Sequence, residues 1–105
     1  MTGPLAAPTD ILHATCVAVD GRGLLILGPS GSGKSGLALR LIALGATLVS
    51  DDRTRITAHE GLLTATCPSP AILGLIEARG LGLLRAPVTE SAKVQVGSCF
   101  AHPVM

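Results

Sequence analysis

A chain of 105 residues is long enough for one hydrophobic core but too short for two. Apolar residues make up 48% of it, Phe100 is the only aromatic residue and the net charge is +1, so neither base stacking nor a basic footprint for a phosphate backbone is indicated. The longest uncharged run, residues 61–76, contains two prolines and three hydroxyl side chains and is too polar and too broken to form a membrane-spanning helix. We therefore expect no nucleic-acid partner and no membrane partner.

The amino terminus and the cysteines both predict a cytoplasmic protein. The segment MTGPLAAPTD lacks the basic region and apolar stretch of a signal peptide. The three cysteines are far apart and form no C-x-x-C pair, which suits a reducing compartment and indicates neither a disulfide framework nor a zinc site. The mean hydropathy of +0.57 predicts a buried sheet or a subunit interface.

The first quarter of the chain predicts a hairpin. Residues 1–10 contain two prolines and are expected to form a loose arm. The apolar runs 11–19 and 24–27 predict two strands, and the turn residues between them, 20–23, form a tight connection. Two strands joined so closely should pair antiparallel.

A helix is predicted over residues 35–44. Leu37, Leu41 and Leu44 would share its apolar face, and Gly45 stands where a left-handed residue would end it.

The remainder of the chain predicts mainly strands, so that residues 11–105 form one α/β domain with a mixed sheet. The expected elements are a strand at 46–50, a hairpin of 53–58 with 62–67, a helical turn near 71–75, a strand at 76–79 and an edge strand at 93–96.

The segment GPSGSGKS matches the phosphate-loop pattern G-x-x-x-x-G-K-[ST] in full. Glycines allow successive backbone N–H groups to point at phosphate oxygens, and the helix that follows directs its positive end at the same phosphates. The lysine would reach the β- and γ-phosphates of ATP, and the final serine would ligate Mg²⁺. The residues of this predicted nucleotide site are Gly28, Pro29, Ser30, Gly31, Ser32, Gly33, Lys34 and Ser35.

An acidic pair, Asp51 and Asp52, directly follows the predicted strand 46–50. An acid at a strand end beside a phosphate loop can hold the metal ion or accept a proton from an attacking hydroxyl. The alternatives are a solvated turn and a helix-capping aspartate.

Three further residues are candidates that the sequence alone leaves open. His13 lies within an apolar predicted strand, where a single histidine is more often structural than catalytic. Glu77 and Arg79 are two residues apart on a predicted strand and would point to one face. They could bind Mg²⁺ and phosphate respectively, or they could simply pair with each other.

Three separated segments resemble one known family. ILHATCVAVDGRGLLILGPSGSGKS, VSDD and IEARGLGLL are similar to the start of the catalytic domain, the acidic pair and the signature segment of HPr kinase/phosphorylase. The resemblance covers roughly residues 11–86 and implies a P-loop domain of the phosphoenolpyruvate-carboxykinase-like type, in which a β-hairpin precedes the phosphate loop. It also implies a homo-oligomer, and a domain truncated at its carboxyl end.

The resemblance assigns roles to individual residues. Asp52 would be the catalytic acid/base and His13 an active-site histidine that modulates it. Lys34 and Ser35 would hold phosphate and Mg²⁺, with Glu77 as a further metal ligand and Asp51 beside it. Arg79 would belong to the segment 76–85, which the family needs for both of its reactions.

The implied function is that of an ATP-dependent serine protein kinase that acts on an HPr-type phosphocarrier and regulates carbohydrate metabolism. The family's second activity removes the phosphoryl group with inorganic phosphate and releases pyrophosphate. Two alternatives stay open: a regulatory module that binds ATP or phosphate without transferring it, and a small-molecule P-loop kinase. The segment EARGLG and the lack of an arginine-rich lid argue against the second.

Overall fold

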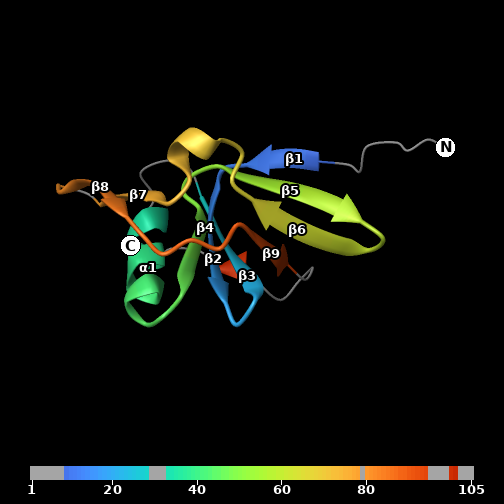
Figure 1. The fold of residues 1–105 in the computed structure, drawn as a ribbon, viewed down its shortest axis with the longest axis horizontal. Helices are drawn as coiled ribbons and strands as arrows, with labels where there is room; N and C mark the ends of the chain where they lie inside the picture. Colours follow the sequence, from blue (N-terminus) through green and yellow to red (C-terminus); the bar gives the residue numbers. More distant parts are fainter. Residues whose placement is uncertain (1–8, 29–32, 79, 95–99, 102–105) are drawn as a thin grey trace.

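A computed structural model describes residues 9–28, 33–78, 80–94 and 100–101, and it shows a mixed α/β fold in which strands predominate (Figure 1). The main sheet has eight strands, in the order β1-β5-β6-β9-β3-β2-β4, and β10 pairs with β3. A separate two-stranded sheet is formed by β7 and β8. The elements are β1 (Thr9–Leu12), β2 (Ala14–Val19), β3 (Arg22–Leu27), α1 (Lys34–Ala43), β4 (Thr47–Ser50), β5 (Thr54–His59), β6 (Leu62–Thr66), a 3-10 turn (Pro70–Ile72), β7 (Leu75–Ala78), β8 (Gly82–Arg85), β9 (Ser91–Val94) and β10 (Phe100–Ala101).

Strand β2 lies at the centre of the fold, between β3 and β4, and pairs antiparallel with both. Its residues 14–18 are all buried, because one face of the strand packs toward α1 and the other toward the second half of the sheet. On the helix side the core contains Val17, Ile26 and Ala38, with Ile76 of β7 closing it. Alternating side chains of β2 therefore serve two cores, as period-two strand geometry requires.

The second core forms on the opposite face of β2, β3 and β4. Cys16 and Leu25 pack there against Ala65 of β6 and Ala92 and Val94 of β9. Strand β9 touches β3 at one parallel pair, Arg22 with Lys93, but it pairs with β6 along its whole length. The sheet consequently bends back over its own face (Figure 1).

The helix and both hairpins confirm the sequence predictions. β2 and β3 are antiparallel across Asp20 and Gly21, and β5 and β6 are antiparallel across Glu60 and Gly61. All four turn residues have positive φ, between 50° and 79°, which is the conformation of two-residue type I′ turns. The left-handed end of α1 at Gly45 is also confirmed, with φ of 112°.

Several predicted boundaries are wrong, and each error has a physical cause. The run 11–19 forms two strands, because the chain bends at His13. Before the bend, β1 pairs with β5, and after it β2 pairs with β3 and β4. Thr9 and Asp10, expected in a loose arm, belong to β1, while the rest of that arm lies outside the described residues. Leu44 follows the last helical residue and is 84% exposed, so it does not contribute to the apolar face.

Two strands of the carboxyl-terminal third also differ from the prediction. The expected edge strand 93–96 is β9, which begins at Ser91 and lies inside the sheet between β6 and β3. Strand β8 was not predicted, because its glycine-rich start indicates a turn. Within the described part of the chain, no helix has the length and apolar character needed to cross a bilayer.

Candidate functional site

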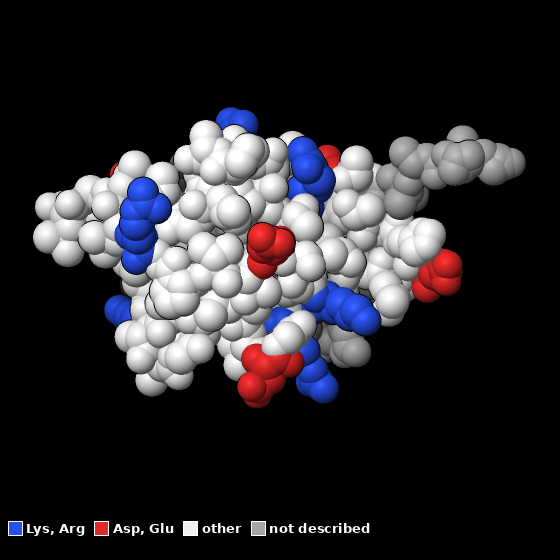
Figure 2. Space-filling model, in the orientation of Figure 1, with Lys and Arg blue, Asp and Glu red and all other residues white. Residues whose placement is uncertain are grey.

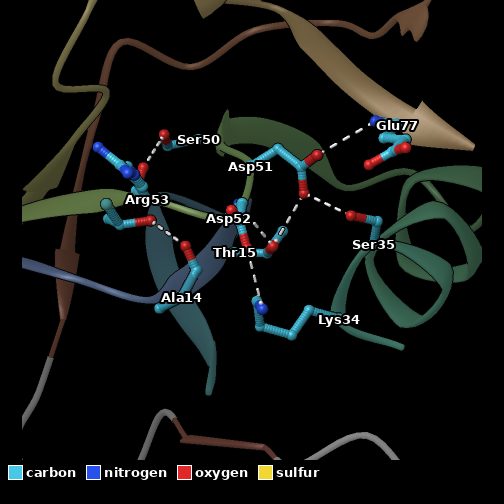
Figure 3. Close-up of polar contacts among 10 residues, drawn as sticks. Ala14, Thr15, Lys34, Ser35, Ser50, Asp51, Asp52, Arg53 and Glu77 are labelled. Atoms are coloured by element: carbon cyan, nitrogen blue, oxygen red, sulfur yellow. Dashed lines mark hydrogen bonds and ion pairs between the residues drawn. The ribbon is translucent and has the colours of Figure 1, made fainter. Parts of the chain in front are cut away.

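The site forms where the first turn of α1 meets the end of β4 and the backbone of β7 at Glu77 (Figure 3). Helix α1 begins at Lys34, directly after Gly33, whose φ of 96° is in the left-handed region. Gly28, at the end of β3, also has a positive φ, of 151°. Both backbone conformations favour glycine, which agrees with the glycines of the motif. Pro29, Ser30, Gly31 and Ser32 lie outside the described residues.

Asp51 joins three elements through its carboxylate. Its Oδ1 accepts hydrogen bonds from Ser35 Oγ at 2.6 Å and from Thr15 Oγ1 at 2.9 Å. Its Oδ2 accepts a hydrogen bond from the backbone N–H of Glu77 at 3.1 Å. Asp51, the residue after β4, thus ties the first turn of α1 to β2 and β7, and it fixes the position of the Ser35 hydroxyl.

Asp52 forms an ion pair with Lys34, the first residue of α1. Its Oδ1 is 3.0 Å from Lys34 Nζ, and the two side chains differ sharply in exposure, at 44% for the aspartate and 3% for the lysine. A buried ammonium group is tolerated only where opposite charge or hydrogen-bond acceptors compensate the lost hydration. Asp52 supplies part of that compensation while it remains accessible to solvent.

The turn that carries the two acids is strained and is held by hydrogen bonds. Asp52 has φ of 67°, a left-handed conformation that is unusual for a residue with a side chain. Its backbone N–H donates to Thr15 Oγ1 at 3.0 Å, and Arg53 N–H donates to the Asp51 carbonyl at 2.7 Å. Ser50 Oγ donates to the Arg53 carbonyl and closes the turn.

Buried polar side chains in the described part of the chain gather around this turn. They are Thr15, Lys34, Ser50 and Thr54. Thr54 donates to the Ala14 carbonyl at 2.8 Å and so fastens the start of β5 to β2. Hydroxyl groups inside a small aliphatic core are costly unless they are bonded, and all three of these are: Thr15 bonds Asp51, Ser50 bonds the Arg53 carbonyl and Thr54 bonds the Ala14 carbonyl.

The structure brings together four of the residues predicted from the sequence: Lys34, Ser35, Asp51 and Asp52. Glu77 lies beside them, but it meets Asp51 through its backbone N–H, and its own side chain is exposed. Ser35 and Asp51 offer hydroxyl and carboxylate oxygens, which are ligands that Mg²⁺ takes. The described residues contain no group of three or more His, Cys, Asp and Glu side chains placed to hold a metal ion.

Two predicted residues are not joined to this group. His13 lies exposed in the bend between β1 and β2, and it makes no hydrogen bond to either aspartate among the described residues. Arg79 lies outside the described residues. One contributor was missed: Thr15, whose only sequence signal is a hydroxyl group in the middle of an apolar strand.

The fold and the site define a class of mixed α/β domain. In this class, helix α1 begins with a lysine that pairs with one aspartate and a serine that hydrogen-bonds to the aspartate before it. The family model described as HPr Serine kinase C-terminal domain matches residues 5–89. The chain therefore belongs to this family.

Individual relatives of the chain belong to the same family. The chain is 45% identical over 83 residues to the HPr kinase/phosphorylase of Bordetella petrii, and 44% identical over 78 residues to that of Clostridium botulinum. These matches cover 78% and 74% of this chain but 27% and 25% of the relatives, so the chain spans about a quarter of their length. The structure of the Hpr(Ser) kinase/phosphatase from Coxiella burnetii superposes with a TM-score of 0.71 at 34% identity, over 81% of this chain and 55% of that one.

Proposed function

We propose that this chain carries the nucleotide-binding and catalytic centre of a serine protein kinase that uses Mg-ATP to phosphorylate an HPr-type phosphocarrier. The observation that supports it most directly is the meeting of Lys34 and Ser35 with Asp51 and Asp52 at one end of the sheet. Phosphoryl transfer requires a cation for the phosphates, oxygen ligands for Mg²⁺ and an acceptor for the hydroxyl proton. These four side chains can supply all three.

Each residue has a proposed task. Lys34 neutralises the β- and γ-phosphates, and the amino-terminal end of α1 adds its positive dipole. Ser35 and Asp51 hold Mg²⁺ through oxygen, with Glu77 as a further ligand. The resemblance to P-loop domains of the phosphoenolpyruvate-carboxykinase-like type supports this arrangement, as does the phosphate-loop sequence. The family resemblance also supports roles for Arg79 in both reactions and for His13 near Asp52.

Mg-ATP supplies the transferable phosphoryl group. In the proposed step, the substrate serine oxygen forms a bond to the γ-phosphorus, the bond from that phosphorus to the β-phosphate oxygen breaks, and ADP leaves. Asp52 accepts the serine proton, for which its partly exposed carboxylate is suited. In the proposed second reaction, an oxygen of inorganic phosphate forms a bond to the phosphorus of phosphoserine, the bond from that phosphorus to the serine oxygen breaks, pyrophosphate leaves and Asp52 gives a proton to the serine oxygen.

The Lys34–Asp52 ion pair connects binding to catalysis. Phosphate oxygens compete with the Asp52 carboxylate for Lys34, because a charge-assisted bond to phosphate is at least as strong as the one it replaces. Nucleotide binding would therefore release Asp52 toward the incoming serine. The cysteine pattern supports a cytoplasmic location, where such a carrier and ATP are found together.

The decisive experiment is incubation of the purified chain with Mg-ATP and a serine-bearing phosphocarrier, followed by detection of phosphoserine by mass spectrometry. A carrier in which the serine is replaced by alanine is the substrate control. Asp52→Asn should retain ATP binding and lose transfer by roughly a hundredfold or more, the usual contribution of a general base. Glu90→Gln, which alters an exposed carboxylate elsewhere, should transfer at the wild-type rate.

Each outcome discriminates. Transfer by Asp52→Asn at the wild-type rate would remove the proton-acceptor role. Tight ATP binding without transfer, even at high protein concentration, would instead support a regulatory module that binds nucleotide. Phosphorylation of a small hydroxyl compound but not of the carrier would support a small-molecule kinase.

A further inference from the structure

We infer that Thr15 is a positioning residue that sets the spacing between the two acids of the site, and this inference rests on the proposed function. Thr15 is completely buried on β2, and its single hydroxyl group serves both aspartates. It donates to Asp51 Oδ1 at 2.9 Å and accepts from the backbone N–H of Asp52 at 3.0 Å (Figure 3). A hydroxyl has one proton and two lone pairs, so it makes both bonds without competition.

The position of Thr15 on its strand makes the hydroxyl a fixed reference point. β2 is hydrogen-bonded on both sides, to β3 and to β4. On the β4 side the ladder pairs Cys16 with Ser50, and its register shifts between Cys16 and Val17. Thr15 and Asp51 are the next residues beyond the Cys16–Ser50 pair. A local shift of register re-aims side chains at the end of a ladder, and here it is followed by the hydroxyl and carboxylate that meet.

The two hydrogen bonds act on different parts of the site. The bond to Asp51 orients the carboxylate that also accepts from Ser35, which is the proposed Mg²⁺ side. The bond from Asp52 N–H holds a residue whose φ of 67° is unfavourable and needs support from its surroundings. Without the hydroxyl, that backbone could relax toward ordinary conformations, and the Asp52 carboxylate would move away from its place beside Lys34. Thr15 itself touches no reacting atom.

The test compares three substitutions. Thr15→Val keeps the shape and removes the hydroxyl, whereas Thr15→Ser keeps the hydroxyl and removes a methyl group. Thr54→Val is the matched control, because Thr54 is equally buried but donates to the Ala14 carbonyl and forms no hydrogen bond with either acid. Both valine variants should lose stability to thermal unfolding. Only Thr15→Val should lose turnover.

We expect kcat for phosphoryl transfer to fall by about tenfold to a hundredfold in Thr15→Val, as for a misplaced catalytic group, while KM for Mg-ATP stays within about twofold. Thr15→Ser should remain within about threefold of the wild-type kcat, because the hydroxyl still reaches both partners. Wild-type kcat in Thr15→Val, or equal loss in Thr15→Ser, would overturn the inference. So would a comparable loss of kcat in Thr54→Val.

A second measurement needs neither activity nor a folded variant. In the wild-type chain, the Asp52 amide should exchange its hydrogen slowly, because its partner is a buried hydroxyl, although the turn lies at the surface. Exchange at the rate of an unprotected amide would refute the role of Thr15. If the wild-type chain transfers no phosphate, the proposed function fails, but protection of the Asp52 amide still supports Thr15 as the residue that holds this turn.

Discussion

Lys34 is buried beside a partner that is itself open to solvent, and this asymmetry is the central electrostatic feature of the site. The side chain of the lysine is 3% exposed and that of Asp52 is 44% exposed. The lysine has therefore already lost most of its hydration before any phosphate arrives. If the proposed function holds, a phosphate that replaces the aspartate would gain a strong interaction without a second desolvation of the lysine.

Removal of this lysine should abolish nucleotide binding. Lys34→Ala should weaken the affinity for Mg-ATP by at least about a hundredfold, which isothermal titration calorimetry can measure. Lys93→Ala, which removes an exposed lysine of β9, is the control and should bind normally. Unaltered affinity in Lys34→Ala would contradict the assignment of GPSGSGKS as a phosphate loop.

The sequence indicates part of this site well and another part not at all. Lys34, Ser35 and the two aspartates are identifiable because a motif, or a strand end that follows it, marks each of them. Thr15 escapes sequence analysis because its partners are fixed by the register of β2 against β4, which no local pattern encodes. The backbone N–H of Glu77 escapes for the same reason, since its bond to Asp51 spans 26 residues of sequence.

At the scale of elements, the tight turns can be predicted from the local sequence, whereas the order of the strands in the sheet cannot. The two hairpins are identifiable because Asp-Gly and Glu-Gly supply left-handed conformations between apolar runs. β9 could not be placed correctly, because its partners β6 and β3 lie far away along the chain. What places it inside the sheet is packing of Ala92 and Val94 on the second core.

The close approach of β9 to β3 is testable at Gly23. A Cβ added there would lie 2.9 Å from Val94 Cγ2, 3.2 Å from Ala92 Cβ and 3.3 Å from Cys16 Sγ. Gly23→Ala should therefore lower the free energy of unfolding by about 1–3 kcal/mol, measured by denaturant titration. The cost should be smaller when the substitution is made in a Val94→Ala background. An equal cost in both backgrounds would contradict the contact.

The two ends of α1 should respond oppositely to alanine. Gly45 has φ of 112° and an added Cβ would meet nothing within 4 Å, so Gly45→Ala should cost about 1 kcal/mol through backbone strain alone. Gly36 lies within the helix with equally open space, and Gly36→Ala should stabilise by up to about 1 kcal/mol. Thermal unfolding of the two variants measures both changes in stability. A change of the same sign in both variants would contradict the left-handed end of α1 at Gly45.

For the molecule as a whole, apolar side chains are unevenly distributed over the surface. Figure 2 shows few charges on the face it presents, and several large apolar side chains on and near the β7–β8 hairpin are exposed. Leu81 is 78% exposed and Leu83 67%, and Leu84 and Val88 are also exposed. One strand of this hairpin is anchored by Ile76, which packs against α1, whereas every residue of β8 is exposed. A two-stranded sheet with an exposed apolar strand gains stability when another surface covers it.

We therefore expect the chain to self-associate through this hairpin, a prediction that agrees with the expected homo-oligomer. Leu83→Ser should weaken association by at least about tenfold, because it removes most of the apolar area that one leucine would bury. Leu62→Ser is the matched control, since Leu62 is 51% exposed but lies at the β5–β6 turn, at the other end of the molecule (Figure 1). Sedimentation velocity over a concentration series measures both variants. A wild-type chain that stays monomeric throughout, or equal weakening by the two substitutions, would show that these leucines do not form the contact between copies.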